Sequence, residues 1–279
     1  MNKAVIIVGM HRSGTSLTAS ILQECGLDIG KELMLEGEGN VKGHFENMDF
    51  YRFHMDLLIK HGHHPDGWVN RKINVKHKFL KGGQNLIDRN ESSAWGWKDP
   101  RTTLFLDFWQ TLLPNAKYLM VYRKPWEVVD SMNRRNTDKV LKQDTEMPIK
   151  AWMHYNKLMI EHFDKHQRDS ILIDIDTLIH NTSAVITQIN TQLGFALKVQ
   201  ESKVFEPTIF TKEASIDDEH VEVFLTNYPE SNKLLRQLQQ RAWPNAFIVN
   251  PSFAQRLAAF FKRNRSILNI SSTCRFCCQ

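Results

Sequence analysis

The stretch Val5-Ile6-Ile7-Val8-Gly9-Met10-His11-Arg12-Ser13-Gly14-Thr15-Ser16 decides the fold of this chain, because a buried-strand pattern leads directly into a glycine-spaced turn. Leu17, Ile21 and Leu22 follow at the spacing of a helix. Backbone amides at a helix start bind anions, and glycines let a ligand approach the backbone closely. We therefore expect an anion site at residues 9–16. An ordinary strand-to-helix turn is the alternative interpretation.

The turn differs from a nucleotide-binding P-loop at one position. That motif, G-x-x-x-x-G-K-[ST], uses its lysine on the β/γ-phosphates and the next hydroxyl on magnesium. Thr15 stands in the place of the lysine, and Arg12 inside the loop supplies the charge instead. The apolar run 118–122 ends in Arg123 and not in a magnesium-binding aspartate. Metal-dependent phosphoryl transfer is therefore disfavoured, and Asp174 and Asp176 are better interpreted as helix caps.

Length and composition favour one α/β domain with helical additions, spanning residues 1–279. The net charge of +5, from 36 basic and 31 acidic residues, is too balanced to indicate nucleic acid and is compatible with an anionic ligand. Cys25 stands apart from Cys274, Cys277 and Cys278, which is unlike a disulfide framework and fits a reducing compartment. The first residues are typical of a strand and no apolar run is of membrane-spanning length, so we expect a soluble, cytoplasmic protein.

Hydrophobic periodicity and capping residues predict strands that alternate with helices. Strands are expected at 5–8, 94–97, 116–122 and 171–175, and helices at 15–26, 47–60, 75–89, 99–113, from 125 onward, at 149–166 and up to 193. This alternation predicts a three-layer α/β/α fold with a central, mostly parallel sheet and ligands at the carboxyl ends of its strands. Residues 44–92 are interpreted as a helical insertion, 217–265 as a C-terminal helical region and 266–279 as a tail.

Three basic residues follow three of the predicted strands. Arg12 comes after the first, Lys98 directly after Trp97, and Arg123 after the run 118–122. Lys98 precedes an Asp99-Pro100 helix start, and Ser131 lies about two turns into the helix that begins near 125. The carboxyl ends of parallel strands share one edge of a sheet. The cluster therefore suits a ligand with several phosphate-like groups.

Three motifs together resemble the sulfotransferases that use 3′-phosphoadenosine 5′-phosphosulfate (PAPS), a family of the P-loop superfamily, and in particular its bacterial and Golgi-type branch. Residues 9–16 look like the family's 5′-phosphosulfate loop, and Trp97-Lys98-Asp99-Pro100 is similar to its lysine motif. Tyr122-Arg123, with Ser131 eight residues later, matches its 3′-phosphate clamp. The resemblance covers residues 5 to about 135.

The resemblance implies transfer of a sulfuryl group from PAPS to an acceptor hydroxyl or amine without a metal. In that interpretation Arg12, Ser13, Gly14, Thr15 and Ser16 hold the 5′-phosphosulfate. Lys98 offsets charge on the oxygen that leaves, while Arg123 and Ser131 hold the 3′-phosphate. Partners are then PAPS, its product 3′-phosphoadenosine 5′-phosphate (PAP), and an acceptor for which a saccharide is the candidate from bacterial relatives.

The family also commonly supplies a glutamate or histidine base from the segment after the first helix. Glu46 in Gly43-His44-Phe45-Glu46-Asn47 is the favoured candidate, with a structural cap as the alternative, and His44 is the second candidate. Glu36 and Glu38 belong to the segment 31–43, which we expect to be a mobile loop with solvated charges. The rival functions are a P-loop kinase-like enzyme and a non-catalytic nucleotide-binding module in surface-polysaccharide assembly.

Several other groups of residues are assigned structural roles and no function. His61, His63 and His64 lie in a turn without a fourth metal ligand at suitable spacing, so no metal is expected. The basic run 71–78 is interpreted as a solvated helix face. Trp152 and Tyr155 either line an acceptor groove or belong to the core. The apolar and basic residues at 253–265 favour core packing over membrane contact. The terminal cysteines are interpreted as part of a frayed tail.

Overall fold

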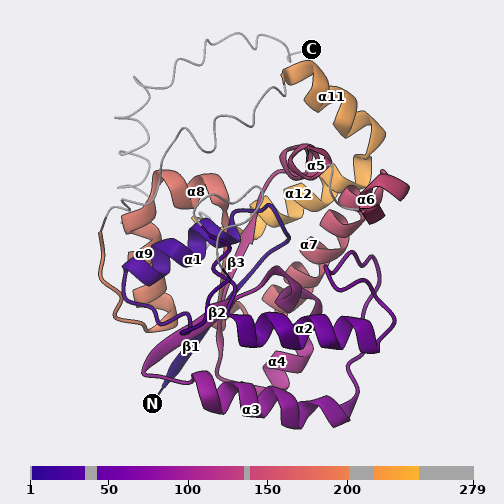
Figure 1. The fold of residues 1–279 in the computed structure, drawn as a ribbon. Helices are drawn as coiled ribbons and strands as arrows, with labels where there is room; N and C mark the ends of the chain where they lie inside the picture. The colour runs from indigo at the N-terminus through magenta and orange to yellow at the C-terminus, as the bar shows by residue number, and fades with distance from the viewer. Residues whose placement is uncertain (1, 35–42, 135–138, 201–216, 245–279) are drawn as a thin grey trace, which may run out of the picture. The chain divides into compact units, whose positions relative to one another are not determined.

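The computed structural model describes residues 2–34, 43–134, 139–200 and 217–244 (Figure 1). Residues up to Trp243 form one compact unit, and of the second unit only its first residue, Pro244, is described. The first half of the chain holds β1 (Lys3–Val8), α1 (Thr15–Glu24), α2 (Met48–Lys60), the 3₁₀ turn η1 (His77–Phe79), α3 (Leu80–Asn90), β2 (Ala94–Lys98), the 3₁₀ turn η2 (Pro100–Phe105), α4 (Leu106–Leu112), β3 (Lys117–Tyr122) and α5 (Pro125–Asn133). The rest holds α6 (Lys139–Gln143), α7 (Met147–Lys165), η3 (Gln167–Asp169), β4 (Ser170–Asp174), α8 (Ile175–His180), α9 (Thr182–Leu193), α11 (Asp218–Asn227) and α12 (Pro229–Arg241).

The four strands form a parallel sheet in the order β2-β1-β3-β4. Ile6 pairs in register with Trp97 on one side and Tyr118 on the other. All four carboxyl ends therefore point to one edge of the sheet, as the sequence predicts. The turn after β1, Lys98 at the end of β2 and the turn after β3 meet at this edge.

Helices cover both faces of the sheet, which confirms the predicted three-layer α/β/α fold. Helices α1, α8 and α9 lie on one face, and α2, α4 and α7 lie on the other (Figure 1). Because strand side chains alternate between faces, Ile6 and Val8 enter the larger core cluster together with Trp97 and Tyr118. That cluster buries several aromatic rings, among them Phe50 stacked on Trp97 with ring centroids 4.0 Å apart.

A glycine lets the first two strands approach closely. A side-chain carbon at Gly96, in the middle of β2, would lie 1.9 Å from the carbonyl oxygen of Val5 in β1. Only a hydrogen fits in that space. One of these strands leads to the turn at residues 9–16, called the anion turn below, and the other ends in Lys98, so the distance between the two strands depends on this glycine.

Three predicted helices have different bounds in the structure. The segment predicted as one helix over 99–113 begins with the 3₁₀ turn η2, and α4 follows. We attribute this to two bonds that tie the turn to the sheet: Trp97 Nε1 donates to Thr102 Oγ1 (3.1 Å), and Thr103 Oγ1 donates to the Gly9 carbonyl (3.2 Å). The helix predicted to end at 193 is divided into α8 and α9 at Asn181, whose backbone is not helical. The helix predicted from 75 begins as α3 at Leu80.

Part of the sequence lies outside the described residues. This includes residues 35–42, with Glu36 and Glu38, and residues 245–279, with the apolar and basic segment and the terminal cysteines. The interpretations given for them remain predictions. Among the helices that the structure describes, none combines the length and the apolar character needed to cross a bilayer.

Candidate functional site

The turn between β1 and α1 has the geometry of an anion cradle. A side-chain carbon at Gly9 would lie 2.3 Å from the Val121 carbonyl oxygen, and one at Gly14 would lie 2.4 Å from Ile175. Gly14 has a left-handed backbone (φ 87°) and no side chain to cap the first turn of α1. Ser13 Oγ is buried and has no hydrogen-bond partner among the described residues. The turn therefore presents helix-start amides and an unsatisfied hydroxyl.

Arg12 reaches out of this turn to the helix after β3. Its Nε donates a hydrogen bond of 2.8 Å to Ser131 Oγ on α5. The backbone of Arg12 is left-handed (φ 67°), which is uncommon for a residue with a side chain and often marks a functional turn. The sequence assigns Arg12 and Ser131 to opposite ends of a ligand, whereas the structure brings them into direct contact.

Arg123 lies at the carboxyl end of β3 and is 11% exposed. Its Nε donates to Glu127 Oε2 (2.7 Å), in the first turn of α5. Trp152 Nε1 on α7 donates to the Arg123 carbonyl (3.0 Å) and so fixes the backbone at the turn. The neighbouring Lys124 pairs with Asp176 at 2.8 Å and with Glu127 at 3.4 Å. This corner of the site is a partly buried cluster of opposite charges.

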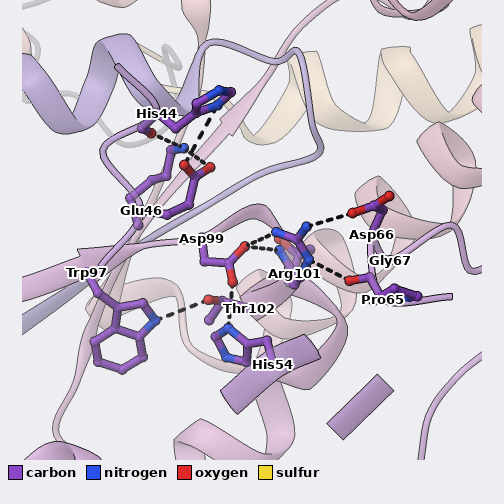
Figure 2. Close-up of polar contacts among 12 residues, drawn as sticks. His44, Glu46, His54, Pro65, Asp66, Gly67, Trp97, Asp99, Arg101 and Thr102 are labelled. Atoms are coloured by element: carbon purple, nitrogen blue, oxygen red, sulfur yellow. Dashed lines mark hydrogen bonds and ion pairs between the residues drawn. The ribbon is translucent and has the colours of Figure 1, made fainter. Parts of the chain in front are cut away.

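Lys98 ends β2 and is almost fully buried, with 1% of its side chain exposed. Its Nζ donates to the Glu46 carboxylate and, at 2.6 Å, to the His44 carbonyl. Figure 2 shows His44 and Glu46 close together beside this contact. The sequence names Lys98 and Glu46 as separate candidates, and the structure joins them as an ion pair across 52 positions of the chain.

Burial sets the protonation chemistry of this pair. It raises the pKa of Glu46, and the nearby Lys98 ammonium opposes that shift only in part. Burial likewise lowers the pKa of Lys98, against the opposing effect of Glu46. Glu46 Oε2 has no hydrogen bond within the described residues, although His44 Nδ1 lies 3.9 Å from it. A carboxyl group with a raised pKa and a free oxygen is suited to accept a proton.

The segment that carries Glu46 is held by its neighbours. The amide of Met34 donates to the Glu46 carbonyl (2.8 Å), and Leu33 forms an antiparallel bridge with Asn47. Asn47 caps α2 by accepting from the Asp49 amide (3.0 Å). Phe45 has a left-handed backbone (φ 56°), a strained conformation of the kind that gathers at functional sites.

Asp99, directly after Lys98, organises a buried polar network (Figure 2). Its carboxylate caps η2 by accepting from the Arg101 amide (3.0 Å), and it also pairs with the Arg101 guanidinium (3.1 Å). His54 Nδ1 donates to its other oxygen at 2.8 Å. Burial alone would raise the pKa of Asp99, but Arg101 and His54 hold it well below its ordinary value. The carboxylate is therefore charged and satisfied.

The tautomer of His54 follows from its two partners. Trp109 Nε1, which can only donate, lies 2.9 Å from His54 Nε2. Nε2 must therefore be the acceptor, and the proton of the neutral ring lies on Nδ1, toward Asp99.

Arg101 connects this network to the turn at 65–68. It donates from Nε to the Pro65 carbonyl (2.8 Å) and lies 3.3 Å from Asp66. Tyr155 on α7 donates to the Gly67 carbonyl (2.9 Å). The next residue of that turn, Trp68, places its ring 5.0 Å from the His11 ring in the anion turn. The turn thus contacts the residues next to Arg12.

The family follows from comparison with known proteins. A model described as the sulfotransferase family matches residues 4–198, well over half of the chain. This chain belongs to the sulfotransferase family. A search of curated proteins with the sequence of this sulfotransferase found no match.

Solved structures resemble this sulfotransferase in fold. A sulfotransferase from Alicyclobacillus acidocaldarius is 14% identical, with a TM-score of 0.54 over 86% of this chain and 97% of that chain. A sulfotransferase from Mycobacterium avium is 12% identical, with a TM-score of 0.48 over 97% and 78%. The sulfotransferase domain of an olefin synthase from Synechococcus PCC 7002 is 17% identical, with a TM-score of 0.45 over 93% and 94%.

The remaining candidates from the sequence have structural partners in this sulfotransferase. His61 Nδ1 donates to the Leu57 carbonyl (2.7 Å), as a helix-ending residue does. Within the described ranges no group of three or more His, Cys, Asp or Glu side chains could hold a metal, and independence from metal remains a prediction. Lys72 in the basic run pairs with Asp107 at the surface. Trp152 and Tyr155 are fully buried, which favours the core interpretation over an acceptor groove.

Several residues of the site are not singled out by the sequence reasoning. Glu127 could be found from its position four residues after Arg123 on a predicted helix, where opposite charges meet. Arg101 follows the recognised Asp99-Pro100 pair, but its target at 65–66 depends on the tertiary fold. His54 gives no signal in the sequence, because it is a histidine on the apolar face of α2.

Proposed function

We propose that this sulfotransferase moves a sulfuryl group from PAPS to a hydroxyl or amine of an acceptor. The observation that carries the proposal is the cluster of basic groups at one edge of the sheet: Arg12 in contact with Ser131, Arg123 beside α5, and the buried Lys98. Several basic groups at one edge of the sheet suit a nucleotide that carries phosphate-like groups on both its 5′ and 3′ positions.

The anion turn fits the 5′-phosphosulfate of such a donor. The orphaned Ser13 hydroxyl and the uncapped start of α1 provide donors that a bound anion would satisfy. Arg12 and residues 13–16 hold this end in the proposal. Arg123 and Ser131 hold the 3′-phosphate, the group that distinguishes PAPS from ATP.

The proposed chemistry exchanges one bond to sulfur for another. The acceptor oxygen or nitrogen forms a bond to sulfur, the bond from sulfur to the bridging oxygen breaks, and the electron pair stays on that oxygen of PAP. Glu46 removes the acceptor proton, with His44 as the second candidate. Lys98 and Arg12 offset the negative charge that develops during transfer. A saccharide is the proposed acceptor class.

The contact between Lys98 and Glu46 supports these roles. Because the carboxylate is paired with a buried ammonium, it is held at one place and in one orientation. Lys98 is the last residue of β2, and its backbone pairs with Ile7, two residues before the anion turn. One ion pair can therefore serve both the acceptor proton and the oxygen that leaves.

Calorimetric titration tests the proposed donor. PAP and ATP are added separately to the purified protein in EDTA, and the ATP titration is repeated with magnesium. Micromolar binding of PAP without magnesium, and much weaker binding of ATP, is the expected result. Tighter binding of ATP, or a strict need for magnesium, would favour a kinase-like enzyme instead. A non-catalytic module would bind PAP but transfer sulfate to no acceptor in a screen that includes saccharides, phenols and amines.

A further inference from the structure

The proposed 3′-phosphate clamp contains an anion of its own. Glu127 uses both carboxylate oxygens on basic side chains: Oε2 accepts from Arg123 Nε of the clamp at 2.7 Å, and Oε1 lies 3.4 Å from Nζ of the neighbouring Lys124. The side chains of Glu127 and Arg123 are 23% and 11% exposed. A charge pair at this depth is less screened by solvent than one at the surface.

The position of Glu127 is fixed by the helix that carries it. Pro125 begins α5, so Glu127 lies in the first turn, where the helix dipole favours a negative charge. The Arg123 backbone is held by Trp152, and Lys124 is held by Asp176. Glu127 therefore meets two basic residues that are themselves restrained. Any phosphate that binds this guanidinium must share it with a carboxylate.

We propose, on the basis of the proposed function, that Glu127 is an internal counter-ion that lowers the affinity of the clamp for a 3′-phosphate. The carboxylate stabilises Arg123 when no nucleotide is bound and repels a phosphate when one arrives. Its effect is specific to nucleotides that carry a 3′-phosphate. The spent donor keeps that phosphate, so Glu127 limits how tightly the product is retained.

Glu127 orients the Arg123 side chain by a hydrogen bond and also carries a negative charge. Two substitutions separate these two effects. Glu127→Gln keeps an oxygen that can accept from Arg123 Nε but removes the charge. Glu127→Ala removes both. If repulsion dominates, the ratio of PAP affinity to AMP affinity rises in both variants and rises more in the glutamine variant.

The experiment is calorimetric titration of the full-length wild type and both variants with PAP and with AMP, which lacks the 3′-phosphate. We expect Glu127→Gln to bind PAP about 3- to 10-fold more tightly, with AMP unchanged. The gain should shrink in 0.5 M salt, roughly the point at which surface charges are strongly screened. Glu146→Gln is the matched control, because Glu146 also pairs with a basic residue four positions away in the chain, Lys150 at 3.1 Å. It should change neither affinity.

Four outcomes would overturn the inference. Weaker PAP binding in Glu127→Gln would mean that the carboxylate only orients Arg123. Equal changes for PAP and AMP would indicate a general effect on the fold, as would an equal change in the Glu146 control. If the wild type binds neither nucleotide, the proposed donor itself is wrong. Thermal unfolding of each variant establishes that it is folded, and the alanine variant provides the same affinity ratio if the glutamine variant is not.

Discussion

Arg12 Nε and Ser131 Oγ are joined by a 2.8 Å hydrogen bond, although 119 positions of sequence separate the two residues. The bond connects the anion turn after β1 to the helix after β3. In the proposed site these elements hold opposite ends of the donor. The two ends are therefore mechanically linked before any nucleotide is present.

Removal of this bond should affect both ends of the donor. Ser131→Ala is expected to weaken PAP binding by about 1.5–3 kcal/mol, because a hydrogen bond to a charged group is lost. It should also weaken adenosine 5′-phosphosulfate, which has no 3′-phosphate, because Arg12 loses its anchor. Titration calorimetry measures both. An unchanged affinity for adenosine 5′-phosphosulfate would mean that Arg12 does not depend on Ser131.

Arg123 should act on one end alone. Arg123→Ala is expected to weaken PAP by about 1.5–3 kcal/mol, the range for a hydrogen bond to a charged group, and to leave AMP nearly unchanged. The same titrations with the two nucleotides measure the difference. A similar loss for both ligands would remove Arg123 from the 3′-phosphate clamp.

Glu46 should control turnover and its pH dependence. Glu46→Gln is expected to lower kcat by roughly 10²–10⁴-fold, as for loss of a general base, while PAP affinity stays the same. In the wild type, burial raises the pKa of Glu46, so activity should fall with decreasing pH at a value above that of an ordinary carboxyl group. The pH profile of kcat, measured with an acceptor found by screening, provides the test. A variant with wild-type kcat would assign the base to another residue, with His44 next.

The ion pair between Lys98 and Glu46 should be strongly coupled in stability. Lys98→Met leaves a buried carboxylate without its cation and is expected to cost about 3–5 kcal/mol. The double variant Lys98→Met, Glu46→Gln should lose much less than the sum of the two single variants. Urea unfolding of the wild type, the two single variants and the double variant at pH 7 measures this coupling in a double-mutant cycle. Additive losses would indicate that the pair contributes little to the folded state.

His162 should make the protein less stable in acid. It is 3% exposed and packs on the Tyr118 ring at 4.3 Å, and burial lowers its pKa to about 4. Between pH 6.5 and 4 the unfolded chain binds the proton and the folded one does not, so stability falls as pH falls through this range. This residue alone should account for about 1–3 kcal/mol.

His162→Phe keeps the aromatic packing and should remove that part of the pH dependence. Urea unfolding at pH 7 and pH 4.5 measures it, with the exposed His180→Gln as control. An unaltered difference between the two pH values in His162→Phe would contradict the assignment.

Local patterns in the sequence predict the frame of the site well. The glycines at 9 and 14, the alternation of strands and helices and the cap at Asp99 are each encoded within a few residues. Whether each of these features forms depends on steric limits and capping bonds between residues that are close in the sequence. These features place the basic residues at one edge of a parallel sheet.

The contacts between distant residues could not be predicted in this way. The pairing of Lys98 with Glu46, and of Arg12 with Ser131, depends on how the segment 43–47 and α5 pack against the sheet. The 3₁₀ form of η2 depends on the bond from Thr103 to Gly9, which also joins separate parts of the chain. Periodicity carries no information about such partners, so the sequence identifies the residues but not which of them meet.

The closeness of β1 and β2 at Gly96 has a consequence for how the family could diversify. With no space for a side chain at that point, the distance between the anion turn and Lys98 is set by the backbone itself. The turn at 65–68 contacts the anion turn through Trp68 and His11, and it contacts Arg101, three residues after Lys98. Because His44 and Glu46 precede α2, a different segment grafted between α2 and β2 could change the surroundings of the proposed site while the proposed base and donor residues are inherited, provided that Gly96 is kept.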